Sequence, residues 1–115
     1  MKLPNYESAV IPRTKVVAYL LSSTHHQGRG KAQFFTRFGF VADSWEALAE
    51  AVLRHAAEHE VKEVEPSPFG SRYIIDGTLQ TPSGRTPNVR TVWFVETGED
   101  FPRFVTAYPL RAKGD

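Results

Sequence analysis

The sequence contains no cysteine, so the chain can form no disulfide, thiolate nucleophile or thiolate metal site, and its stability must come from packing and hydrogen bonds. It also lacks an apolar run near the roughly 18 to 20 residues that cross a bilayer, and its first residues lack the hydrophobic stretch of a secretory signal. We therefore expect a cytoplasmic protein, or a fragment of a larger one, with no membrane contact and no cofactor.

The length and composition suit a single domain. The chain has 115 residues, of which 41% are hydrophobic and 23% are charged, which supplies apolar material for one core but not for two. We expect residues 1–115 to form one domain with 9–110 as its ordered part, and the ends, 1–8 and 111–115, to be frayed.

Acidic residues are scarce at the start of the chain and abundant in its middle. Residues 1–42 hold six basic groups and one acid, whereas residues 43–65 hold seven acids and two basic groups. The net charge of the whole chain is only +1. A domain polarised in this way can offer a basic face to a polyanion. The alternative is that these charges only solvate helix surfaces.

The spacing of apolar residues predicts three helices in the first half of the chain. The first runs from Pro12 to Leu21, the second from Lys31 to Phe38, and the third begins after Asp43. Asp43 and Glu46 match a capping box, in which the two side chains satisfy free N–H groups of the first turn.

After Glu60 the apolar period changes from about 3.6 to 2, which indicates strands. The expected strands are Val61–Glu65, Ser71–Leu79, Asn88–Thr97 and Phe101–Leu110. Their connections are too short for a crossover helix, so the sheet should be an antiparallel meander. The predicted fold is α+β, with three N-terminal helices packed on a four-stranded antiparallel sheet.

A turn centred on residues 98 and 99 predicts the register of the last hairpin. Trp93 then lies opposite Phe104, Thr91 opposite Thr106, and Val89 opposite Tyr108. All six side chains would share one face of the sheet, although a slip of one residue would exchange the faces.

Two short strings resemble catalytic motifs and are rejected. The string from His55 to His59 reads H-x-x-E-H, the ligand pattern of inverted zinc metalloproteases, but it lacks a third ligand downstream, and we favour a structural role for both histidines. The string from Gly28 to Lys31 lacks the spacing and the preceding strand of a phosphate loop. We therefore expect neither a metal site nor ATP or GTP binding.

A cluster of two imidazoles and two cations remains, formed by His25, His26, Arg29 and Lys31. A histidine exchanges protons near neutral pH, while lysine, arginine and the free N–H groups of a helix start hold a phosphate and its transition-state charge. RNA cleavage needs these parts and no metal, because the 2′-hydroxyl is the nucleophile. The alternative is a solvated polar loop whose histidines contact the backbone.

The chain resembles an uncharacterised bacterial family, a numbered domain of unknown function. The resemblance rests on Leu3-Pro4-Asn5, the segments from Lys15 to Leu21 and from His26 to Phe35, Gly39-Phe40, Thr91-Val92-Trp93, and the segment from Pro102 to Pro109. Domains of this kind often occur in toxin-like gene contexts, as tails of polymorphic toxins or beside a short antitoxin gene. The resemblance thus implies a cognate inhibitor.

A more distant resemblance suggests a mechanism. Helices followed by a four-stranded antiparallel sheet are similar to the ribonuclease superfamily of barnase, EndoU, the colicin D and colicin E5 tRNases and the RelE toxins. Members similar to colicin D have a Lys/His group at a helix reading H-x-x-x-F-G, and a hydroxyl residue and an aromatic two apart on the final strand. Here Lys31 precedes Phe34, Phe35 and Gly39, and Thr106 and Tyr108 stand on the last strand.

This resemblance implies roles for five residues. His26, or failing it His25, would act as general base or acid, and Lys31 would hold the scissile phosphate. Thr106 would hydrogen-bond a phosphate oxygen, and Tyr108 would stack on a base or hold the phosphate.

Further residues are assigned to substrate binding. Arg29 would join Lys31 on the phosphate, and Arg72 and Arg90 would contact the RNA backbone unless they are ordinary surface charges. Thr91 and Trp93 could instead supply the hydroxyl and the aromatic, although a strand tryptophan opposite a phenylalanine also suits a core pair.

The sequence thus predicts a metal-independent ribonuclease toxin that cleaves RNA by 2′-hydroxyl attack, with tRNA as one candidate substrate. A cognate antitoxin or immunity protein would neutralise it. The alternative is a non-catalytic binding module that grips RNA or an acidic protein, or the immunity partner of a toxin.

Overall fold

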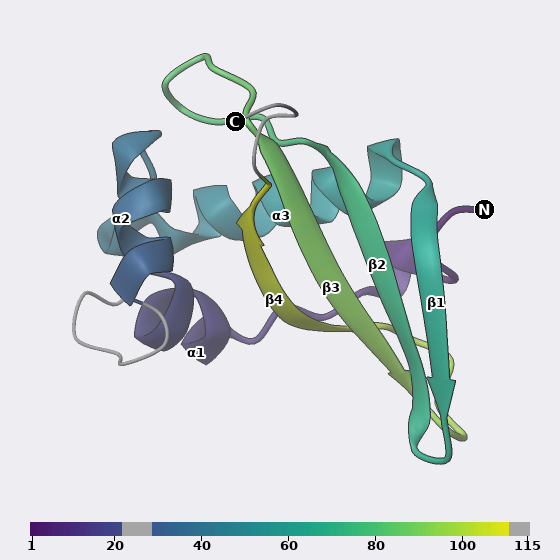
Figure 1. The fold of residues 1–115 in the computed structure, drawn as a ribbon. Helices are drawn as coiled ribbons and strands as arrows, with labels where there is room; N and C mark the ends of the chain where they lie inside the picture. Colours follow the sequence, from purple (N-terminus) through teal and green to yellow (C-terminus); the bar gives the residue numbers. More distant parts are fainter. Residues whose placement is uncertain (22–28, 111–115) are drawn as a thin grey trace.

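The structure, a computed structural model, describes residues 1–21 and 29–110 (Figure 1). Its helical elements are η1 (Tyr6–Ser8), α1 (Arg13–Lys15), η2 (Val16–Leu20), α2 (Arg29–Arg37), η3 (Ala42–Ser44) and α3 (Trp45–Glu58). Its strands are β1 (Val61–Ser67), β2 (Gly70–Thr78), β3 (Asn88–Glu96) and β4 (Arg103–Pro109). The four strands therefore follow the helices, in the order that the sequence predicts.

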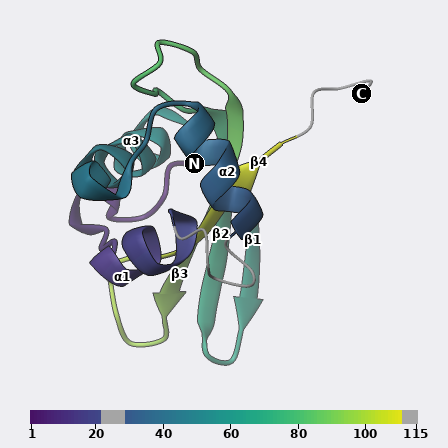
Figure 2. The ribbon, with the colours of Figure 1, turned by 90° about the vertical axis from the view of Figure 1, so that its left-hand side faces the viewer.

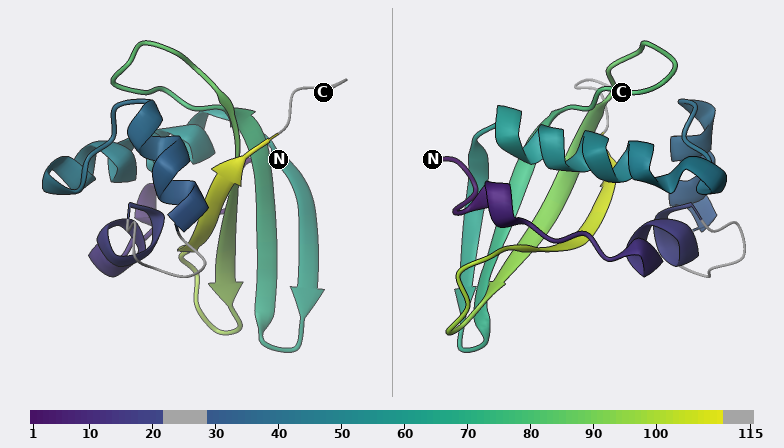
Figure 3. Two further views of the ribbon diagram at one scale, coloured as in Figure 1. Left: turned by 60° about the vertical axis from the view of Figure 1, so that its left-hand side comes forward. Right: turned by 180° about the vertical axis from the view of Figure 1, so that it is seen from behind.

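The strands form one antiparallel sheet in the order β1-β2-β3-β4, which confirms the predicted meander. α3 lies across one face of this sheet, and the other face carries no helix among the described residues (Figure 3). α2 stands beside the edge strand β4 and contacts it (Figure 2). Within residues 1–21 and 29–110, no helix is long and apolar enough to cross a membrane.

The prediction of three helices packed on the sheet is wrong. α3, with 14 residues, is the long helix of the described chain, and η3 precedes it directly. The segment predicted as the first helix has three α-helical residues and then widens into the π-helical η2, where the Leu21 N–H bonds the Val16 carbonyl five residues back. This wider turn buries Leu20 and Leu21 together.

The capping box at Asp43 does not form as predicted. Residues 42–44 make the single 3-10 turn η3, and Ser44 is the residue that precedes α3. Ser44 makes no side-chain capping hydrogen bond. The helix start is therefore held by the preceding turn and by burial of its apolar stripe, in which Leu48 and Val52 are almost fully buried.

The core lies between α3 and the sheet. Trp93 of β3 and Phe104 of β4 meet edge to face, with ring centroids 5.4 Å apart and planes at 71°. Ile75 of β2 is buried against the same cluster. The N-terminal segment joins it, because Leu3 is 1% exposed and the Val61 N–H bonds the Met1 carbonyl at 2.7 Å. Residues 1–8 are thus part of the fold, where the sequence predicted a frayed end.

The register of the β3–β4 hairpin departs from the prediction after its first pair. Trp93 lies opposite Phe104 as expected, but the register then shifts, so that Val92 pairs with Thr106 and Arg90 with Tyr108. The extra residue in β4 is Val105, which makes a β-bulge. The predicted grouping of Thr106 and Tyr108 with Trp93 on one face is therefore wrong.

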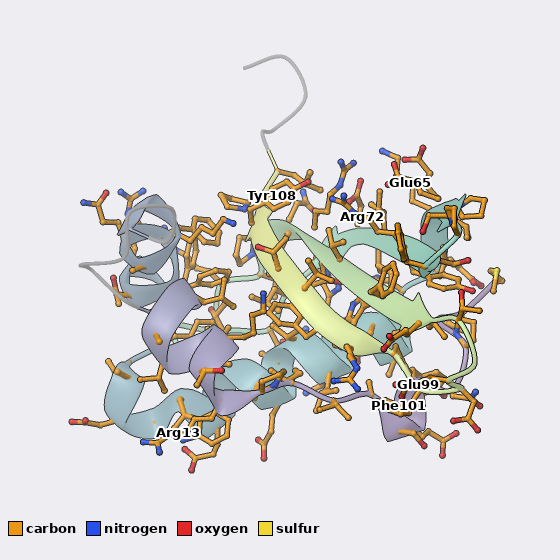
Figure 4. All side chains as sticks on the ribbon, turned by 90° about the horizontal axis from the view of Figure 1, so that it is seen from below. Arg13, Glu65, Arg72, Glu99, Phe101 and Tyr108 are labelled. Carbon is orange, nitrogen blue, oxygen red and sulfur yellow. The ribbon has the colours of Figure 1, made fainter. Side chains whose placement is uncertain are left out.

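Thr106 and Tyr108 lie instead on the face of the sheet away from α3, which we call the open face. In Figure 4 the Tyr108 side chain stands on the side of the sheet opposite α3. The strand pairing places Asp76, Arg90 and Tyr108 in one row across β2, β3 and β4, with Thr106 in the next row. The bulge thus turns the last strand's polar side chains outward and keeps Phe104 in the core.

Candidate active site

Lys31 lies in the first turn of α2, and its side chain reaches β4. Ala32 and Phe35 form the buried side of this helix, which contacts η2 and β4. This packing fixes the first turn beside the last strand. Lys31 Nζ donates a hydrogen bond of 2.9 Å to Thr106 Oγ1, which joins residues 75 positions apart in the sequence.

Tyr108 lies next to this pair. Lys31 Nζ is 5.8 Å from the centroid of the Tyr108 ring, within the range of a cation–π contact. Lys31, Thr106 and Tyr108 are each partly exposed, so a ligand arriving from solvent can reach them. The structure therefore brings together three residues that the sequence assigned to the site.

A second cation stands on the other side of Tyr108. Arg90 of β3 is the register partner of Tyr108, and its guanidinium holds Asp76 of β2 through two hydrogen bonds, Nε to Oδ1 at 2.7 Å and Nη2 to Oδ2 at 2.9 Å. Lys62 of β1 donates to the same carboxylate at 3.1 Å. Lys62, Asp76, Arg90, Tyr108 and Lys31 thus form a continuous polar row across the open face.

The ionisation of this row follows from its contacts. The hydrogen bond from Arg90, followed by that from Lys62, lowers the pKa of Asp76 although its partial burial acts in the opposite direction. The carboxylate of Asp76, and then the phenol of Tyr108, raise the pKa of Arg90. Both groups of the ion pair are therefore charged throughout the physiological range.

The arrangement suits an anionic ligand that bridges α2 and β4. An ammonium, a hydroxyl and a phenol converge there from two elements, and such donors stabilise phosphate oxygens and the charge that develops on them. Among residues 1–21 and 29–110, no group of three or more His, Asp or Glu side chains is placed to hold a metal ion.

Thr91 and Trp93 lie on the opposite face, in the core, and both have no exposed surface. Trp93 Nε1 donates to Thr91 Oγ1 at 3.0 Å, and Thr91 Oγ1 lies 3.1 Å from Nδ1 of His55. A substrate cannot reach either residue. The interpretation of Trp93 as a core partner of Phe104 is the one that the structure supports.

His55 completes this buried network. Its Nε2 lies 2.9 Å from the Val89 carbonyl and 3.2 Å from the Gly77 carbonyl. Since carbonyl oxygens only accept, Nε2 carries the proton, and Nδ1 accepts from the Thr91 hydroxyl. Burial, as the largest cause, lowers the pKa of His55. The H-x-x-E-H string thus places a neutral structural histidine in the core.

The remaining predicted residues have different outcomes. His25 and His26 lie outside the described residues, as does the side chain of Arg29, whose backbone begins α2. Arg72 lies on the open face, where its Nε is 3.7 Å from a carboxylate oxygen of Glu65 (Figure 4). It stands four positions from Asp76 along β2, away from Lys31.

Sequence reasoning missed Asp76 and Lys62. Their place in the row depends on the registers of β1–β2 and β2–β3. The segment between β2 and β3 is too long for a two-residue turn to fix that register from the sequence. The only signal in the sequence is that Asp76 falls on the polar side of the apolar alternation in its strand. The same pattern is typical of a strand whose polar face only meets water.

Comparison with known proteins places the chain in a family. The family described as "Domain of unknown function (DUF6883)" matches residues 2–111. The chain belongs to this family. The matched range includes Lys31, Thr106 and Tyr108. No curated protein matches this DUF6883 chain.

A similar solved structure is a chain of a "Contact-dependent growth inhibition toxin - immunity protein complex from Klebsiella pneumoniae 342". The TM-score is 0.73 at 19% sequence identity, and the match covers 93% of the DUF6883 chain and 97% of the other. At this identity the likeness shows that the two chains share a fold.

Proposed function

We propose that this DUF6883 domain is a metal-independent ribonuclease toxin, which cleaves RNA by attack of a 2′-hydroxyl and is neutralised by a cognate immunity protein. The observation that carries the proposal is the hydrogen bond of 2.9 Å from Lys31 Nζ to Thr106 Oγ1. It assembles the predicted phosphate-binding groups on an accessible face from two distant parts of the chain.

In this proposal, Lys31 binds a non-bridging oxygen of the scissile phosphate, and Thr106 donates its hydroxyl to the same group. A phosphorane-like transition state carries more negative charge on these oxygens than the ground state does, so a fixed cation lowers the barrier. Arg90 adds a second positive charge within the same row. His26 or His25 remains the proposed general base.

The shared fold supports the toxin part of the proposal. The similar chain comes from a complex of a growth-inhibition toxin with its immunity protein, and either member of such a complex needs a protein partner. The solvent-accessible cluster of Lys31, Thr106 and Tyr108 favours the toxin over the immunity protein, because an immunity protein has no need of a phosphate-binding group.

A substitution of Lys31 tests the catalytic assignment. We expect Lys31→Gln to lower the rate of RNA cleavage by about 100-fold or more, since it removes a charge that stabilises the transition state. The assay measures cleavage of bulk tRNA by the purified chain in the presence of EDTA. Arg37→Gln is the matched control, because Arg37 is an exposed cation at the other end of the same helix, and it should cleave as the parent does.

Growth of a bacterial host separates the toxin from the binding module. Expression of the parent chain should arrest growth, expression of Lys31→Gln should not, and co-expression of the neighbouring gene should restore growth with the parent. Normal growth on expression of the parent, together with intact tRNA in the purified assay, contradicts the proposal and favours a binding or immunity role.

A further inference from the structure

The phenol of Tyr108 stands between two fixed cations. Arg90 is its register partner on β3, while Lys31 Nζ approaches the ring from α2 at 5.8 Å. Asp76 prevents the guanidinium from turning away, since it accepts two hydrogen bonds from it. These are the charged groups that face Tyr108 from the described elements around it.

The direction of the Arg90 contact decides what the phenol can do. A guanidinium only donates hydrogen bonds, so Arg90, the register partner of Tyr108, can approach the phenolic oxygen only as a donor and leaves the phenolic proton for another acceptor. If that proton departs, the phenolate left behind lies beside Arg90 and Lys31. The two cations therefore lie where negative charge would form if Tyr108 donated its proton.

We propose that Tyr108 is the general acid of the cleavage reaction, and that Asp76 is a positioning residue that acts through Arg90. This inference rests on the proposed ribonuclease function and adds to it the source of the proton for the leaving group. Its structural basis is the row in which β2, β3 and β4 place Asp76, Arg90 and Tyr108 side by side.

Cleavage exchanges one phosphorus–oxygen bond for another. The 2′-oxygen forms a bond to phosphorus, and the general base takes the proton of the 2′-hydroxyl. The bond between phosphorus and the 5′-oxygen breaks, its electron pair stays on that oxygen, and the phenol of Tyr108 supplies the proton. The products are a 2′,3′-cyclic phosphate and a 5′-hydroxyl, and the phenolate regains a proton from water.

A substrate with a better leaving group tests the step. The probe is an RNA oligonucleotide that carries the cleavage site mapped on tRNA, made with either oxygen or sulfur as the 5′-bridging atom. A thiolate departs without a proton, so it needs no general acid. We expect Tyr108→Phe to lower the cleavage rate by about 100-fold or more with oxygen and by less than about tenfold with sulfur.

The control variant is Tyr73→Phe, which removes a phenol from β2 on the core side of the sheet and should cleave both probes as the parent does. An equal loss on both probes, or no loss on either, overturns the role of Tyr108 while leaving the ribonuclease function intact. Failure of the parent chain to cleave either probe overturns the ribonuclease function itself, and the role of Tyr108 with it.

Asp76→Asn tests the positioning role. The variant keeps the shape of the side chain but loses the charge that aligns Arg90, so we expect a smaller, roughly tenfold loss with the oxygen probe and little loss with the sulfur probe. A thermal transition close to that of the parent shows that the variant is folded. A loss of equal size on both probes shows that Asp76 only supports the structure.

Discussion

At the scale of single residues, the buried network of His55, Thr91 and Trp93 shows how a polar group is kept in a core. Each donor in the chain from the Trp93 indole to the Thr91 hydroxyl to Nδ1 of His55 has an acceptor, and Nε2 donates to backbone carbonyls. Within the described residues, no buried side-chain nitrogen or oxygen lacks a partner. A second proton on His55 has no acceptor in this network, so the network requires the neutral imidazole.

This requirement predicts how stability depends on pH. Burial lowers the pKa of His55 in the folded chain, so the unfolded chain binds the proton first as the pH falls through about 6.5. The free energy of unfolding should therefore be constant above that pH and decrease below it, by at most about 1.4 kcal/mol per pH unit from this group. Urea unfolding at pH 7.5 and 5.5 measures the effect.

His55→Gln should abolish this part of the pH dependence and lower the free energy of unfolding at pH 7.5 by about 1–3 kcal/mol, because it leaves buried partners unsatisfied. His59→Gln is the control, since His59 is less buried and bonds the Thr78 carbonyl at the end of β2. A pH dependence that is unchanged in His55→Gln contradicts the assignment.

At the scale of elements, the sequence predicts the strands better than the helices. Alternation of apolar residues places all four strands close to their observed ranges, and the central strands β2 and β3 are the ones that bury a face against α3. The prediction of the first helix is wrong because the chain forms a π turn there, which buries Val16, Leu20 and Leu21 together. The 3.6-residue period of an α-helix does not describe that spacing. Lys31 and Thr106 could be named from the sequence, but the bulge at Val105 that turns Thr106 outward could not.

The β1–β2 hairpin gives a prediction at this scale. Gly70, the first residue of β2, has φ of 148°, and a β-carbon there would lie 2.8 Å from Cζ of Phe94 and also strike the Val95 carbonyl. We expect Gly70→Ala to lower the free energy of unfolding by about 1–3 kcal/mol, which denaturant unfolding measures.

The matched control is Gly30→Ala in α2, where an added β-carbon meets no atom of the described residues within 4 Å. This change should be neutral or stabilising by up to about 1 kcal/mol, since alanine is the better helix former. Equal effects of the two substitutions contradict the account of Gly70.

At the scale of the whole molecule, the charges of the open face are mixed. Asp76 neutralises part of the positive charge of Arg90 and Lys62, and Glu65 lies beside Arg72. Lys31 and Arg90 are the cations next to Tyr108. The proposed enzyme should hold RNA with few phosphate contacts, in keeping with a net charge of only +1.

This balance predicts a shallow dependence of RNA binding on salt. Two phosphate contacts to single-stranded RNA give a slope of about −1.4 in a plot of log K against log salt, so affinity should fall by about sevenfold between 50 and 200 mM NaCl. Fluorescence anisotropy with a 2′-O-methyl oligonucleotide measures binding without cleavage. Lys31→Gln should reduce the slope by about 0.7, and an unchanged slope would show that Lys31 does not contact phosphate.

The extra residue at Val105 also affects how this chain is compared with others. In a chain of the same fold that lacks the bulge, fewer residues separate the partner of Trp93 from the equivalent of Tyr108. That equivalent residue therefore comes one position earlier in the last strand. Consider a sequence alignment that matches Trp93 and Phe104 with their equivalents and allows no gap in the last strand. Beyond Phe104, it would then match each side chain that points outward in one chain with one that points inward in the other. Superposition of coordinates, rather than spacing along the chain, is the sound basis for deciding which relatives carry the same hydroxyl and phenol.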